Sequence, residues 1–94
     1  MDTIIAGIGA DDIDGGADGD TIDAGGGRDT IRGLGGGDDI DGGPGRDEIF
    51  GGDGPDTIVG DSGDDVIESE LGNDVVRGGD GIDEIRAGEG DDTL

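Results

Sequence analysis

The sequence predicts an all-β fold, a parallel β-roll solenoid in which two sheets of short strands face each other and each coil holds eighteen residues. The chain repeats every nine residues from Ala6 onward, without insertion or deletion. Within each unit the sixth position is always Asp, and the eighth is always Ile, Val or Leu. The fourth position is Gly in every unit except at Asp18. A strict internal repeat of this kind is typical of solenoids, whose units bury their apolar faces against their neighbours.

The composition indicates that apolar burial alone does not hold this fold. The 94 residues include 27 acidic residues, 5 basic residues and 26 glycines, with a formal charge of −22. Phe50 is the one aromatic residue. High charge, abundant Gly and few large apolar groups are typical of disordered chains. A second source of stability is therefore needed, and the regular Asp column is the candidate.

The first six residues of each unit predict a turn, because Gly at the second and fourth positions allows positive φ and close backbone approach. Some turns depart from this pattern. The second position holds Leu34, Asp61 or Glu70 in three units, and the unit that begins at Ser69 lacks both leading glycines. We expect the spaces between stacked turns, here called gaps, to bind a ligand more weakly or with altered geometry where they touch turns 15–20, 33–38, 60–65 and 69–74.

The last three residues of each unit predict a short strand, with the eighth position inward and the seventh and ninth outward. Hairpins do not fit, because one uniform frame repeats the same turn each time. Two units therefore make one eighteen-residue coil, and equivalent strands stack in parallel at about 4.8 Å. This register places Arg32 beside Asp14 and Arg86 beside Glu68 on the outer surface.

The coil geometry gathers the sixth-position carboxylates into two stacks, one along each edge. Like charges about 5 Å apart repel, and a divalent cation between successive turns reverses that effect. Each interior Asp has two oxygens and can serve an ion on either side. Turn carbonyls would complete the six to eight oxygens that calcium prefers, whereas magnesium demands a tighter octahedron. The predicted ligands are Asp11, Asp29, Asp47, Asp65 and Asp83 on one edge and Asp20, Asp38, Asp56, Asp74 and Asp92 on the other. Four gaps along each edge give about eight calcium ions.

The units match a known motif. Units such as GGPGRDEIF (42–50), GGDGPDTIV (51–59) and GGDGIDEIR (78–86) fit the nonapeptide G-G-x-G-x-D-x-U-x, where U is a large aliphatic residue. The chain resembles the repeats-in-toxin (RTX) family over essentially its whole length. The resemblance implies that the sixth-position aspartates and neighbouring carbonyls bind calcium. It also implies a region of a type I-secreted bacterial protein that stays unfolded in the cytoplasm and folds outside the cell, secreted or on the cell surface.

Other functions are disfavoured. The chain has no His, Cys or Lys, so it lacks the usual groups for transition-metal or thiol chemistry, and we expect no enzyme. The charge of −22 argues against nucleic acid as a partner, and no apolar run predicts membrane insertion. Residues 1–94 form a single predicted array without visible caps. Two roles stay open: a calcium-triggered folding module, or a structural, adhesive or engineered calcium-responsive solenoid that self-associates end to end.

Overall fold

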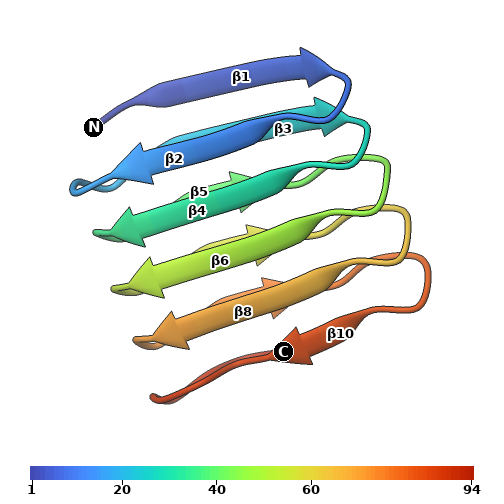
Figure 1. The fold of residues 1–94 in the computed structure, drawn as a ribbon. Helices are drawn as coiled ribbons and strands as arrows, with labels where there is room; N and C mark the ends of the chain where they lie inside the picture. The colour runs from blue at the N-terminus through green and yellow to red at the C-terminus, as the bar shows by residue number, and fades with distance from the viewer.

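The computed structural model describes residues 1–94 and consists of ten strands with no helix, which confirms the predicted all-β class (Figure 1). The chain winds as a flattened coil, and its two termini lie at opposite ends of the stack (Figure 1). The strands are β1 (Thr3–Ile8), β2 (Asp12–Gly16), β3 (Thr21–Gly26), β4 (Thr30–Gly35), β5 (Asp39–Asp41), β6 (Glu48–Asp53), β7 (Thr57–Val59), β8 (Val66–Leu71), β9 (Val75–Arg77) and β10 (Glu84–Arg86).

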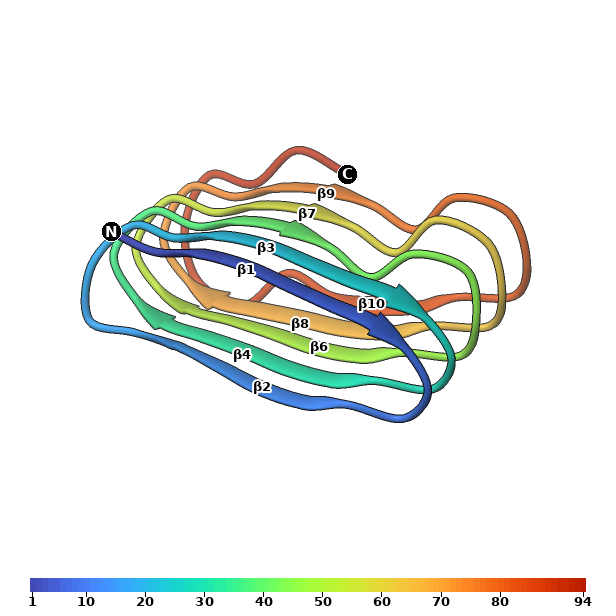
Figure 2. The same cartoon turned by 90° about the horizontal axis from the view of Figure 1, so that it is seen from above.

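The strands form two parallel five-stranded sheets that face each other across a thin interior (Figure 2). One sheet has the order β1-β3-β5-β7-β9 and the other β10-β8-β6-β4-β2. Each residue pairs with the one eighteen positions later, as in Ile4 with Ile22 and Ile13 with Ile31. The predicted eighteen-residue coil is therefore confirmed.

The core is a single layer of aliphatic side chains between the sheets. Side chains alternate along each strand. The sixth and eighth positions of a unit and the first position of the next unit therefore face inward, while the seventh and ninth positions face solvent. Thr21 and Thr57 are accordingly exposed. The buried core comprises Ile13, Ile22, Ala24, Ile31, Ile40, Ile49, Ile58, Ile67 and Val76, with Ile4 and Ile85 packed against it at the two ends.

Six of the ten strands are longer than the three residues predicted from the sequence. β1, β3, β4, β6 and β8 contain six residues and β2 contains five. In these strands the first residues of the next unit stay extended and continue to pair with the neighbouring strand. The pairs Leu34–Gly52 and Gly35–Asp53 are examples. The predicted six-residue turn was thus too long, because part of it lies in the sheet.

The turns keep one backbone path even where glycine is absent. Leu34, Asp61 and Glu70 adopt φ values of 78°, 78° and 74°, in the left-handed region that glycines occupy in other units. Left-handed backbone costs an L-residue roughly 1–2 kcal/mol, so stacking overrides local preference here. The turn around Asp18 is the exception. Asp18 has no positive φ and lacks the backbone hydrogen bond that Gly27 and Gly36 donate to the next coil at 3.0 Å.

The outer faces carry the predicted cross-strand ion pairs. Arg32 Nη1 lies 3.4 Å from Asp14 Oδ1, and Arg86 Nη1 lies 3.0 Å from Glu68 Oε1. Both pairs are solvent-exposed, so each contributes less than about 1 kcal/mol. The chain forms no helix of the length and hydrophobicity that crossing a bilayer requires.

Candidate metal sites

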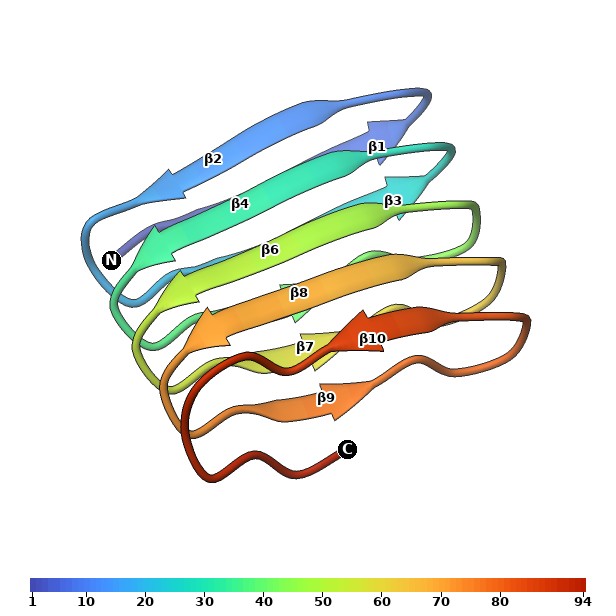
Figure 3. The same ribbon diagram turned by 60° about the horizontal axis from the view of Figure 1, so that its bottom comes forward.

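The turns place the sixth-position aspartates in two continuous columns along the edges of the solenoid. The two rims of turns that hold these columns are visible in Figure 3. Seven of the ten predicted ligands are buried, with side chains at most 3 % exposed, and Asp11, Asp83 and Asp92 near the ends are half-buried. The buried seven are Asp20, Asp29, Asp38, Asp47, Asp56, Asp65 and Asp74. The structure thus brings all ten predicted residues into the two columns.

In nine of the ten predicted ligands, all except Asp11, one carboxylate oxygen accepts a hydrogen bond from the preceding coil. The backbone N–H of Asp29 donates to Oδ1 of Asp47 at 2.9 Å, and that of Asp38 donates to Oδ1 of Asp56 at 2.8 Å. The same bond recurs between every Asp of the column and its counterpart eighteen residues later, from Asp2–Asp20 to Asp74–Asp92. These bonds fix the orientation of the carboxylate and so direct its second oxygen.

The second oxygen has no partner in the protein. Oδ2 is buried and accepts no hydrogen bond in Asp11, Asp20, Asp29, Asp38, Asp47, Asp56, Asp65 and Asp74. A buried polar group without a partner costs about 1–3 kcal/mol, and more when it is charged. Eight repetitions of this arrangement in one small chain indicate a site for a ligand that supplies positive charge.

Main-chain carbonyls complete the oxygen-rich gaps between successive turns. The fourth-position carbonyls of Gly27 and Gly45 accept no backbone hydrogen bond and point at the next turn, because a Cβ on Gly45 would overlap the Gly27 oxygen. The carbonyls of the first position in each unit point toward the preceding turn. A Cβ on Gly42 would lie 2.8 Å from Asp47 Oδ2 and 3.2 Å from the Gly60 oxygen. Carboxylate and carbonyl oxygens from two turns therefore converge on each gap.

The electrostatics of the columns favour a bound cation. Burial raises the pKa of Asp47 to about 6, against the hydrogen bond from the Asp29 backbone, and the charges of Asp29 and Asp65 add to the increase. Burial likewise raises the pKa of Asp56 to about 6. A divalent ion beside these groups would relieve both the burial and the mutual repulsion of the carboxylates.

The donors fit a hard cation. Every available ligand atom is a carboxylate or carbonyl oxygen, which is the ligand set that calcium prefers. No group of three or more acidic side chains comes together to hold an ion, so carbonyls must supply much of the coordination. The aspartates of two adjacent turns, with the carbonyls of the same turns, would hold each ion and join the coils through it.

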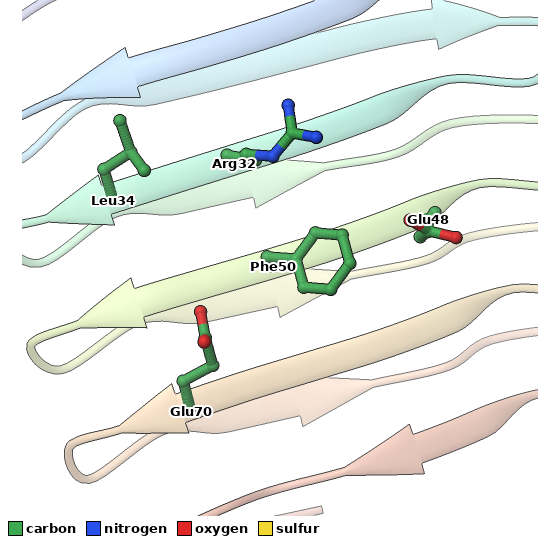
Figure 4. Close-up of a pocket in the computed structure, with 5 residues that line it drawn as sticks. All are labelled: Arg32, Leu34, Glu48, Phe50 and Glu70. Carbon is green, nitrogen blue, oxygen red and sulfur yellow. The ribbon is translucent and has the colours of Figure 1, made fainter.

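A separate hollow lies on the outer face of β4, β6 and β8. Arg32, Leu34, Glu48, Phe50 and Glu70 line it, and Figure 4 shows them projecting from the outer surface of these strands. None of the ten predicted ligands belongs to this hollow. It therefore lies apart from the metal sites.

Two parts of the site were not predicted from the sequence. The use of Oδ1 by a backbone N–H depends on the stagger between coils, which no residue type signals. The second is the buried hydroxyl of Ser69, whose Oγ donates to the Ala87 carbonyl at 2.6 Å, because the sequence indicates only that a glycine is absent at this position. The signal that could have identified it is that the first position faces inward, next to the Asp column.

Comparison with known proteins agrees with this chemistry. The profile of a family described as the RTX calcium-binding nonapeptide repeat matches four overlapping segments, residues 2–22, 15–49, 41–76 and 69–94. Together these segments span almost the whole chain. No curated protein and no solved structure gives a significant match.

Proposed function

This chain belongs to the RTX calcium-binding nonapeptide repeat family, and we propose that it is a calcium-binding module that folds when calcium binds. The observation that carries the proposal is the set of eight buried Oδ2 atoms without a protein partner. Without a cation these oxygens make the folded state costly. Binding and folding then become one equilibrium, because the oxygens converge only when the coils stack.

The ligands of the proposed sites are the ten sixth-position aspartates, with the carbonyls of adjacent turns. Five turns on each edge leave four gaps per edge, which supports about eight ions. Eight divalent ions would reduce the net charge of −22 to about −6. Residues 1–94 then act as one array, since the ladders run without interruption from β1 to β9 and from β2 to β10.

The experiment that tests the proposal is far-UV circular dichroism during a calcium titration, starting in chelator. We expect a disordered spectrum in chelator and a cooperative transition to β-structure as calcium rises. Magnesium at the same concentrations is the control and should produce little β-structure, because it dehydrates reluctantly and demands an octahedral site. β-structure already present in chelator at pH 7, or equal responses to both ions, would contradict calcium-coupled folding.

A second role uses the same chemistry. A calcium-loaded solenoid could serve as an acidic structural or adhesive repeat, natural or engineered, that associates end to end. The end strands β1, β2, β9 and β10 each pair with one neighbouring strand, and the outer edges of β1, β2 and β10 are unpaired, whereas β9 also bridges Thr93. Sedimentation velocity with calcium separates the roles, because a monomer at all concentrations favours the folding module and concentration-dependent growth favours the structural one.

The family resemblance also supports an extracellular setting, secreted or at the cell surface, for a chain that folds with calcium. Calcium-coupled folding would keep the chain unfolded wherever calcium is scarce. Expression in a low-calcium compartment followed by transfer to a calcium-containing medium tests this: protease resistance should appear only after the transfer.

A further inference from the structure

Ser69 is the one hydroxyl buried among the first-position residues of the array. It lies in β8 and its side chain is completely buried. Its Oγ donates a hydrogen bond to the carbonyl oxygen of Ala87 at 2.6 Å, one coil further along. This is the one hydrogen bond by which a side-chain hydroxyl joins two coils of the solenoid.

The bond occupies an oxygen that faces a gap between turns. On the same edge, a Cβ on Gly51 would lie 2.6 Å from Asp56 Oδ2 and 2.9 Å from the carbonyl of Ser69, so these two oxygens converge where glycine leaves space. One coil later the equivalent space is filled by the side chain of Ser69. The equivalent carbonyl, that of Ala87, already accepts the hydroxyl proton.

We propose that in the gap between turns 69–74 and 87–92 the Ser69 hydroxyl takes the place of a calcium ion, which lowers the expected number from about eight ions to about seven and leaves Asp92 without an ion to bind. The inference rests on the proposed function of the other gaps. A calcium ion needs six to eight oxygens, and here one carbonyl is withdrawn while a positively polarised hydrogen points into the gap. The hydroxyl instead links the two coils directly, with a bond that requires no metal.

The other oxygens of this gap do not compensate for the loss. The carbonyls of Glu70 and Glu89 accept backbone hydrogen bonds at 2.9 Å and 3.0 Å, and Asp92 Oδ1 accepts the N–H of Asp74 at 2.9 Å. Of the kinds of oxygen that converge on the other gaps, Asp74 Oδ2, Asp92 Oδ2 and the Gly72 carbonyl accept no hydrogen bond here. These three oxygens fall well short of the six to eight of a calcium shell.

Native mass spectrometry of the calcium-loaded chain, which counts bound ions individually, tests the inference. The variants are Ser69→Ala, which removes the hydroxyl and keeps the Cβ, and Ser69→Gly, which restores the glycine of the repeat. Both are expected to bind one calcium ion more than the wild type. Ala24→Gly is the matched control, because Ala24 is the other fully buried non-glycine first-position residue and carries no hydroxyl. Its ion count should equal that of the wild type.

The outcomes separate the two proposals. If the wild type binds calcium and both Ser69 variants bind the same number of ions, the hydroxyl does not exclude an ion and the inference fails alone. A gain in Ser69→Gly but not in Ser69→Ala would assign the exclusion to the Cβ and would also overturn it. If neither the wild type nor any variant binds calcium, the proposed function fails and the inference fails with it.

Discussion

At the residue scale, each of the seven buried sixth-position aspartates gives its two oxygens different environments. Oδ1 accepts the backbone N–H of the Asp one coil earlier, and Oδ2 stays buried without a donor. The sequence predicted that each interior carboxylate can serve an ion on either side. The structure adds that the hydrogen bond on Oδ1 orients the group, so Oδ2 is the oxygen most available to a cation.

Replacing a central ligand is expected to do more damage than replacing a terminal one. Asp47→Ala leaves the buried N–H of Asp29 without an acceptor and removes an oxygen that faces the interior of the stack. We expect a loss of about 1–3 kcal/mol in the calcium-folded state, and a smaller loss for Asp92→Ala, whose side chain is half-buried. The calcium concentration at the midpoint of the circular dichroism transition measures the loss of stability in each variant. Equal losses in Asp47→Ala and Asp92→Ala would contradict the stacked-ligand arrangement.

The pH dependence of the metal-free fold follows from the raised pKa values. Asp47 and Asp56 have a pKa of about 6 in the folded chain, above the ordinary 3.8, so the folded state binds more protons. Their contribution to stability is full below pH 3.8 and is lost as the pH rises through 6. In chelator we therefore expect more β-structure at pH 5 than at pH 7.

Calcium should reverse this trend, since it binds the deprotonated carboxylates and competes with the protons. With calcium present, acidification from pH 7 to pH 5 should release ions and raise the calcium midpoint. Circular dichroism at both pH values, with and without chelator, provides the measurement. Identical spectra in chelator at pH 5 and pH 7 would show that the buried aspartates do not control the metal-free fold.

At the scale of the elements, the turns depend on close approach between successive coils. Gly45 has a φ of 135°, and a Cβ at this position would overlap the carbonyl oxygen of Gly27 in the coil before it. Glycine is needed here for two reasons, the left-handed backbone and the contact. Gly26, by contrast, has no positive φ and nothing within 4 Å of its Cβ position.

Gly45→Ala is therefore expected to destabilise the calcium-loaded fold by more than the roughly 1–2 kcal/mol of left-handed strain. Gly26→Ala serves as the matched control and should change stability by less than about 0.5 kcal/mol. Urea denaturation in saturating calcium compares the two variants. A similar loss in both would mean that the turns of adjacent coils lie further apart than the structure indicates.

The strands depend on one layer of aliphatic side chains. Ile49 is completely buried in β6, so Ile49→Ala should cost about 2–5 kcal/mol. Ile5 in β1 is 75 % exposed, and Ile5→Ala should have little effect. The same urea denaturation measures both, and a small loss at Ile49 would indicate that the ions rather than the thin core hold the sheets together.

The elements also show how far the sequence could predict the structure. The inward eighth position and the outward seventh and ninth positions followed from the repeat, because a strand alternates its faces strictly. Strand length could not be predicted from the repeat. Glycines such as Gly51 and Gly52 predict a turn, whereas β6 continues through them and keeps pairing with β8. Leu34 and Glu70 adopt a glycine-like backbone for the same reason: neighbouring coils impose a path that local propensity opposes.

At the scale of the whole molecule, folding should appear as a large compaction. The structure has a radius of gyration of 11.5 Å, whereas an unfolded chain of this length has one of about 30 Å. Repulsion within a chain of charge −22 favours the expanded form until cations bind. Small-angle scattering should show a fall toward the folded value as calcium is added. A compact chain in chelator would show that repulsion between carboxylates does not oppose collapse.

The overall architecture was the part most fully predictable from the sequence. A frame without insertions permits one coil length, and that length determines the two sheets, the two columns of turns and the cross-strand partner of each residue. Arg32 and Asp14 meet as the frame required. The details of each gap were beyond the sequence, because they depend on where carbonyls point and on single atoms such as Ser69 Oγ.

The uniform register also determines how the molecule would respond to a pulling force. The termini lie at opposite ends of the stack, and each coil contacts its neighbours through the same eighteen-residue offset (Figure 1). Tension between the ends would peel away one coil at a time. Each event would release eighteen residues, or about 60 Å of extended chain. The solenoid would therefore lengthen in equal steps, with calcium setting the force at which each step occurs.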